Sequence, residues 1–189
     1  MKCVHTFTKN WLLSVLFFLL LSASADADQN DVRLAELFRS LKSTKSVSIA
    51  SVFESKIWDI WMEHYDSEVE SAMFQGVEAM KLQQFEQAFG HFSLLIKLAP
   101  DYAEGWNKRA SVLYLMGRFK ESEADVMRTL ELEPRHFGAL SGQGLIRIAL
   151  QDWTGAIYLL ESALKINPHM HGVIMNLKYA RQKQKESMT

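Results

Sequence analysis

Three histidines follow two of the chain's prolines, where they could hold a metal ion. His136 comes after Pro134 in the stretch LEPRH, and His169 and His171 come after Pro168 in INPHM. Imidazole nitrogens bind zinc and copper, but such a site needs three or four ligands in a closed shell, and no carboxylate cluster stands obviously beside these histidines. The pattern is a weak candidate for a metal or small-ligand site, and the sequence assigns no cofactor.

Other residue patterns that could carry catalysis have simpler explanations. Gly138, Gly142 and Gly144 in FGALSGQG miss the G-x-G-x-x-G spacing of a phosphate-binding loop and fall in an expected helix rather than after a strand. The sequence contains no Gly-x-Ser-x-Gly nucleophile motif, and the carboxylates between positions 121 and 133 are spaced like the solvated face of a helix. We therefore expect no enzymatic activity.

The segment 1–27 has the three parts of an export signal. Lys2 and Lys9 form a basic start, Trp11–Leu21 is an apolar core, and small residues allow cleavage after Ala25 or Ala27. The apolar run is shorter than the roughly 20 residues of a membrane span. We expect an exported protein, most simply a bacterial periplasmic one, with retention of the segment as an anchor as the alternative.

Cysteine content and net charge exclude further kinds of site and partner. The only cysteine, Cys3, lies inside the signal, so a processed chain would hold no disulfide and no thiolate metal site. A formal net charge of −1 gives no electrostatic footprint for nucleic acid or an anionic membrane. The expected partners are proteins or peptides, of a kind that the sequence does not specify.

The chain is built on a repeat whose period is marked by proline. Its only three prolines, Pro100, Pro134 and Pro168, are equally spaced, and positions between them agree in kind. The recurring small positions are Gly76, Ala110 and Gly144, then Ala88, Ser122 and Ala156; the aromatic ones are Phe85, Phe119 and Trp153; the apolar ones before proline are Leu98, Leu132 and Ile166.

Each unit predicts two helices. In the first copy apolar residues fall at helical spacing over about 69–82 and 85–98. The small residues lie where two helices must approach closely, and proline ends the second helix before the next unit begins. The sequence thus predicts an all-α fold, a right-handed α-solenoid of antiparallel helix hairpins.

These residues resemble the tetratricopeptide repeat (TPR), which has the same period. The second copy, AEGWNKRASVLYLMGRFKESEADVMRTLELEPRH, has Trp106, Ala110, Gly117, Phe119 and Pro134 in the places of that family's pattern. The chain is also similar to small exported bacterial TPR proteins of unassigned function. The resemblance implies a protein-interaction scaffold whose first helices line a concave groove.

The repeat divides the chain into segments. They are a signal at 1–27, an N-terminal helical pair at 28–68 read as a degenerate repeat, repeats at 69–102, 103–136 and 137–170, and a capping helix at 171–189. Trp58 and Trp61, in the helical pair, could form a partner-binding patch, but core packing is the simpler role because their spacing lets them contact elements on two sides.

The resemblance places the groove on the first helix of each repeat. The positions it implies are Met73, Phe74, Val77 and Met80, then Asn107, Lys108, Ser111 and Tyr114, then Ser141, Gly142, Leu145 and Ile148. We expect the methionines to give apolar affinity and Asn107, Lys108 and Tyr114 to give direction. The chain's own N-terminal helices could instead cover the apolar end of the groove.

One version of this repeat binds the C-terminal carboxylates of chaperones through Lys, Asn and Arg side chains. The equivalent positions here are Met73, Val77, Lys108, Gly138 and Gly142, of which only Lys108 could supply charge. The sequence therefore disfavours that version. A groove position for Lys108 also predicts that Lys108→Ala changes stability by no more than about 0.5 kcal/mol.

Overall fold

A computed structural model describes residues 28–188 of the 189-residue chain. The expected export signal, with Cys3 and both candidate cleavage sites, lies outside the described residues. Every regular element in the described part is an α-helix, so the all-α prediction is confirmed. No helix between residues 28 and 188 is long and apolar enough to span a membrane.

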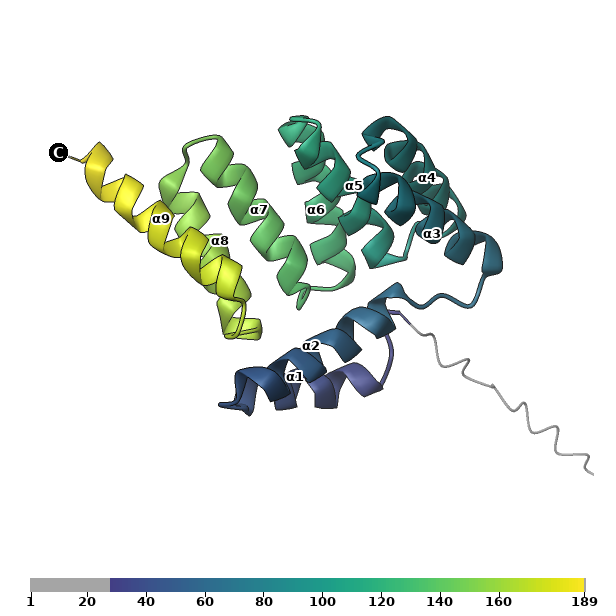
Figure 1. Cartoon of the computed structure of the whole chain (residues 1–189), viewed down its shortest axis with the longest axis horizontal. Coiled ribbons are helices and arrows are strands. Elements are labelled where there is room, and N and C mark those ends of the chain that lie inside the picture. The colour runs from purple at the N-terminus through teal and green to yellow at the C-terminus, as the bar shows by residue number, and fades with distance from the viewer. Residues whose placement is uncertain (1–27, 189) are drawn as a thin grey trace, which may run out of the picture.

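Three antiparallel helix hairpins stack side by side, each corresponding to one sequence repeat (Figure 1). The first helices also meet one another, since α5 contacts α7 and α7 contacts α9, and α9 packs on α8 at the end of the stack. The bounds are α3 (Ser67–Lys81), α4 (Phe85–Leu98), α5 (Ala103–Leu115), α6 (Phe119–Leu132), α7 (Phe137–Ala149), α8 (Trp153–Ile166) and α9 (His171–Ser187).

The small repeat positions let the two helices of a hairpin approach closely. A Cβ added at Gly76 would lie 2.4 Å from Phe92 Cε1, and one at Gly144 would lie 2.6 Å from Leu160 Cδ2. Because these side chains belong to the partner helix, a larger residue would force the hairpin apart. The predicted reason for small residues at these positions is confirmed.

The turns repeat as regularly as the helices. Gln83, Gly117 and Gln151 link the two helices of successive hairpins, and all three have left-handed backbone, with φ of 57°, 73° and 58°. The loops between hairpins carry the prolines, and Trp106 Nε1 donates a hydrogen bond of 2.9 Å to the carbonyl oxygen of Pro100. The Trp106 indole therefore fixes the first of these prolyl turns.

The N-terminal pair, α1 (Arg33–Ser43) and α2 (Val47–Met62), crosses below the stacked hairpins (Figure 1). Here α1 contacts α8 and α2 contacts α5. The interpretation of residues 28–68 as a degenerate repeat is therefore wrong in its placement, because the pair does not stack on α3 and α4. Its apolar residues, including Leu34, Ile57 and Trp61, instead share a core with Phe137 at the start of α7.

The pair is held at the first prolyl turn by hydrogen bonds. Gln29 Nε2 donates to the carbonyl oxygen of Asp101 at 2.7 Å, and Gln29 Oε1 accepts from the Ala103 amide at 3.2 Å. The buried Tyr102 hydroxyl donates to the carbonyl oxygen of Trp61 at 2.7 Å.

The other two prolyl turns also contact this pair. The Arg135 guanidinium lies 4.6 Å from the centre of the Phe38 ring, within the range of a cation–π interaction. His169 Nε2 lies 3.1 Å from the carbonyl oxygen of Thr44, to which it can donate. The α1–α2 pair thus runs along the edge of the solenoid where all three prolines lie.

Candidate binding pocket on the first helices

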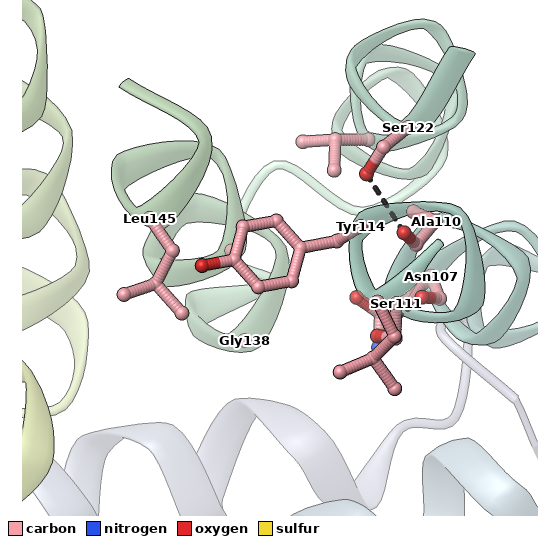
Figure 2. A pocket seen from close by; sticks show the side chains of 10 residues that line it. Asn107, Ala110, Ser111, Tyr114, Ser122, Gly138 and Leu145 are labelled. Atoms are coloured by element: carbon pink, nitrogen blue, oxygen red, sulfur yellow. Dashed lines mark hydrogen bonds between the residues drawn. The ribbon is translucent and has the colours of Figure 1, made fainter. Parts of the chain in front are cut away.

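A pocket of about 280 Å³ opens between α5 and α7, on the side where the first helices meet. Figure 2 shows the Tyr114 ring extending from α5 toward Leu145 on α7, with Ser122 of α6 above α5. Ten uncharged residues line the pocket: Asn107, Ala110, Ser111, Tyr114, Leu115, Ser122, Val126, Gly138, Gly142 and Leu145.

Five of the twelve positions expected to line the groove come together here. They are Gly142 and the side chains of Asn107, Ser111, Tyr114 and Leu145, contributed by the second and third repeats. Tyr114 and Leu145 are half-buried. Ser111 is held by its own helix, since its hydroxyl donates to the carbonyl oxygen of Asn107 at 2.9 Å. The four side chains thus place a few polar groups beside a mainly apolar wall.

The expected groove residues of the first repeat lie outside this pocket. Met73 is only 3% exposed and belongs to the core between α3 and α4, so its placement on a binding surface is wrong. Val77 and Met80 are partly buried and pack against the same core. Phe74 is 66% exposed and remains accessible to a partner. The apolar end of the expected groove is thus mostly internal packing.

Lys108 is engaged by a buried carboxylate at the start of α5. Its Nζ lies 2.9 Å from Glu104 Oε1, and the Glu104 side chain is 1% exposed. The other carboxylate oxygen, Oε2, accepts from Asn107 Nδ2 at 2.9 Å and lies 2.8 Å from His136 Nε2. Lys108, which was expected to help direct a partner, is thus paired within the chain.

The hydrogen bonds of His136 define its tautomer. Its Nδ1 accepts the backbone N–H of Ala139 at 3.0 Å, and an accepting nitrogen carries no proton. The ring proton therefore lies on Nε2, which donates to Glu104 Oε2. His136 serves both as the N-cap of α7 and as a donor to the buried carboxylate.

Glu104 remains ionised although its side chain is buried. Burial favours the neutral acid, but the ammonium of Lys108 and the hydrogen bond from His136 outweigh it, so the pKa of Glu104 lies below its ordinary value. At neutral pH the site holds a carboxylate and an ammonium in direct contact, and their charges cancel.

The N-terminal pair covers this cluster. The Trp61 ring stacks on the His136 ring, with centroids 4.1 Å apart and planes at 8°. The Trp58 ring reaches α7, where a Cβ added at Gly138 would lie 2.6 Å from Trp58 Cη2. Core packing, the simpler of the two roles expected for the tryptophans, describes both contacts. The pair covers the starts of α5 and α7, and the pocket opens beside it.

The three candidate metal ligands are not gathered into one site. His136 is fully buried with both ring nitrogens engaged. His169 binds the carbonyl oxygen of Thr44, and His171 is exposed at the start of α9. Across residues 28–188, no three or more His, Cys, Asp or Glu side chains cluster closely enough to hold a metal.

Known proteins resemble this chain in sequence and in fold. No family model matches the chain. A TPR repeat-containing protein of Rhizobium etli is 35% identical over 114 residues, which is 60% of this chain. The match spans only 56% of that relative's length.

Two solved structures share the fold. The Sgt2 TPR domain of Aspergillus fumigatus superimposes with a TM-score of 0.62 at 19% identity, covering 65% of this chain and 82% of that one. The first TPR domain of Spaghetti (RPAP3), bound to the HSP90 peptide SRMEEVD, gives a TM-score of 0.61 at 21% identity, covering 64% and 96%. With its evenly spaced prolines and its stacked hairpins, the chain has the fold of the tetratricopeptide repeat domains and resembles a TPR repeat-containing protein in sequence.

Proposed function

We propose that this protein is a non-catalytic interaction scaffold that binds a segment of another polypeptide at the pocket between α5 and α7. The observation that carries the proposal is the pocket itself, an uncharged hollow of about 280 Å³ on the first helices, with Tyr114 and Leu145 partly open to solvent. A hollow of this kind suits an apolar side chain from an extended or helical segment.

A polar group at the pocket can orient the segment. Tyr114 can hydrogen-bond to the backbone of a bound chain, because a phenol offers a donor and an acceptor, whereas Asn107 is only 7% exposed and its amide already donates to Glu104. Burial of one apolar side chain would supply about 1.5–3 kcal/mol, which explains affinity but not direction. Tyr114 therefore takes the orienting role that was expected of Asn107, Lys108 and Tyr114 together.

The solved neighbours support a polypeptide ligand. The RPAP3 domain is bound to an HSP90 peptide, and another structural neighbour, the second RPAP3 domain, is in complex with the HSP70 peptide SGPTIEEVD. We extend only the general mode, a short segment held on TPR helices, to this chain.

We also propose that the protein works outside the cytoplasm, in the bacterial periplasm. The support is the sequence of residues 1–27, with its basic start, apolar core and small cleavage-site residues. N-terminal sequencing of the protein recovered from a periplasmic extract tests the proposal. We expect a new terminus after Ala25 or Ala27, and a membrane-bound chain that begins at Met1 would contradict it.

A peptide-display selection tests the binding proposal. Peptides selected on the wild-type protein should share an apolar anchor residue and should lose binding to Leu145→Glu, which places a charge in the pocket wall. The matched control is Leu150→Glu, just beyond α7, where Leu150 is 52% exposed and does not line the pocket. Peptides that bind both variants as well as the wild type would exclude this pocket as the site.

A further inference from the structure

We propose that Glu104 determines which class of ligand the pocket accepts, namely an apolar side chain inside a neutral stretch of polypeptide rather than one next to a carboxylate. The inference rests on the proposed function, because it concerns the same pocket. It goes further by naming the ligand chemistry and the residue that selects it.

The first support is the lining. All ten residues around the pocket are uncharged, and the apolar ones include Ala110, Val126 and Leu145. A carboxylate brought into such a place would lose hydration without meeting a counter-charge, which is costly. The lining alone therefore favours a neutral ligand group.

The second support is the position of Lys108. It follows the pocket residue Asn107 on α5, and its ammonium lies 5.5 Å from the centre of the Trp58 ring. Trp58 in turn contacts Gly138, another pocket residue. Lys108 thus stands at the end of the pocket covered by the N-terminal pair, where a cation could attract a ligand carboxylate.

Glu104 removes that attraction. Its carboxylate holds the Lys108 ammonium at 2.9 Å, and the Lys108 side chain is only 23% exposed. An approaching anion would meet an ion pair without net charge, and pulling Lys108 away would deprive the buried Glu104 Oε1, which has no hydrogen-bond partner, of its counter-ion. An acidic chain end such as that of SRMEEVD, the peptide in the RPAP3 complex, is therefore a poor ligand here.

Two small probes with the same side chain separate the two ligand classes. N-acetyl-leucine methylamide imitates a leucine within a chain, and N-acetyl-leucinate imitates a leucine at a free carboxyl end. Each is titrated into the full-length protein while the backbone amide signals of Gly142 and Leu145 are followed by NMR. The dissociation constants are measured for the wild type, Glu104→Gln and the double variant Glu104→Gln/Lys108→Met.

We expect the wild type to bind the neutral probe more tightly. In Glu104→Gln the freed ammonium should strengthen binding of the carboxylate probe by about twofold to fivefold, the range of a partly exposed ion pair. The double variant should lose that gain, because methionine keeps the alkyl stem of Lys108 without its charge. Dispersed amide signals in each variant confirm that it is folded.

The outcomes separate the two proposals. Equal affinity for both probes in all three proteins, or preference of the wild type for the carboxylate, would overturn the role of Glu104 and leave the pocket as a binding site. If neither probe shifts the Gly142 and Leu145 signals, the pocket itself is refuted as the binding site. Should Glu104→Gln fail to fold, Lys108→Met alone decides, because a selective loss of carboxylate binding there would show that Glu104 does not neutralise Lys108.

Discussion

Replacing Lys108 by methionine tests the buried ion pair most directly. Methionine keeps most of the alkyl stem that packs beside Trp58 and removes the ammonium. Glu104 Oε1 then loses the group that lies 2.9 Å from it and has no hydrogen-bond donor in its place. The other oxygen keeps its donors from Asn107 and His136, so the loss is partial.

The expected cost follows from these contacts. A charged hydrogen bond contributes about 1.5–3 kcal/mol, and breaking a fully buried pair costs about 3–5 kcal/mol. Because Glu104 Oε2 stays bonded and Lys108 is 23% exposed, we expect the lower range, about 1.5–3 kcal/mol. This exceeds the change of about 0.5 kcal/mol or less that the sequence predicted for loss of this lysine.

Urea unfolding at neutral pH, followed by circular dichroism, measures the cost. Lys178→Met serves as the control, because Lys178 is exposed on α9, and its free energy of unfolding should stay within about 0.5 kcal/mol of the wild type. In a Glu104→Gln background the substitution at Lys108 should cost clearly less, since the charge it balances is gone. A cost for Lys108→Met no larger than that of the control would refute the buried pair.

Three further predictions concern the same region. Because folding lowers the pKa of Glu104, its ionised carboxylate contributes fully to stability above the unfolded pKa of about 4.3, and this contribution is lost as the pH falls through the folded pKa. The wild type should therefore lose more stability on acidification than Glu104→Gln. Equal losses in urea titrations at low pH would contradict this. Gly138→Ala should cost about 1–3 kcal/mol by pushing Trp58, whereas Gly142→Ala, with open space around its added Cβ, should not destabilise; similar unfolding curves would be the contrary result. Ala110→Leu, at a buried repeat position, should also cost about 1–3 kcal/mol, and a melting temperature equal to that of the wild type would contradict that.

The repeat architecture was predictable because each unit obeys a local rule. Gly76 and Gly144 allow helices to touch, and Pro100 ends a helix whatever lies around it. Such requirements depend on residues close in sequence and recur in every repeat, so a position that is ambiguous in one copy can be assigned from the other copies. The same register placed Asn107, Ser111, Tyr114 and Leu145 in one pocket.

The position of the α1–α2 pair was not predictable by that reasoning. One repeat period before Pro100 lies Asp66, which suggested one more stacked unit ahead of α3. What decides the position is complementarity with distant turns, such as Trp61 stacking on His136. One signal was present, since α2 has apolar residues on several sides, including Trp58 and Ile60, as expected for a helix with partners on more than one face.

Glu104 was missed for a related reason. A glutamate in the first turn of a helix ordinarily faces water and interacts with the helix dipole. Here the first turn of α5 lies under the α1–α2 pair, so the same residue becomes buried and needs Lys108 and His136 as partners. Glu104 is buried because a segment distant in sequence covers it, and no local sequence pattern indicates such a contact.

This arrangement makes the covering pair and the ligand preference depend on one carboxylate. Glu104 accepts a hydrogen bond from His136, on which Trp61 stacks, and it forms an ion pair with Lys108 at the end of the pocket. A substitution that disturbs Glu104 should therefore change both the stability of the α1–α2 attachment and the response to ligand charge. A substitution at Leu145 touches the pocket wall without entering this cluster, so it should alter affinity while leaving charge preference and acid sensitivity in place. The substitutions at Glu104 and Leu145 should differ in this way only if the Glu104–Lys108 ion pair and the pocket lie where the structure places them.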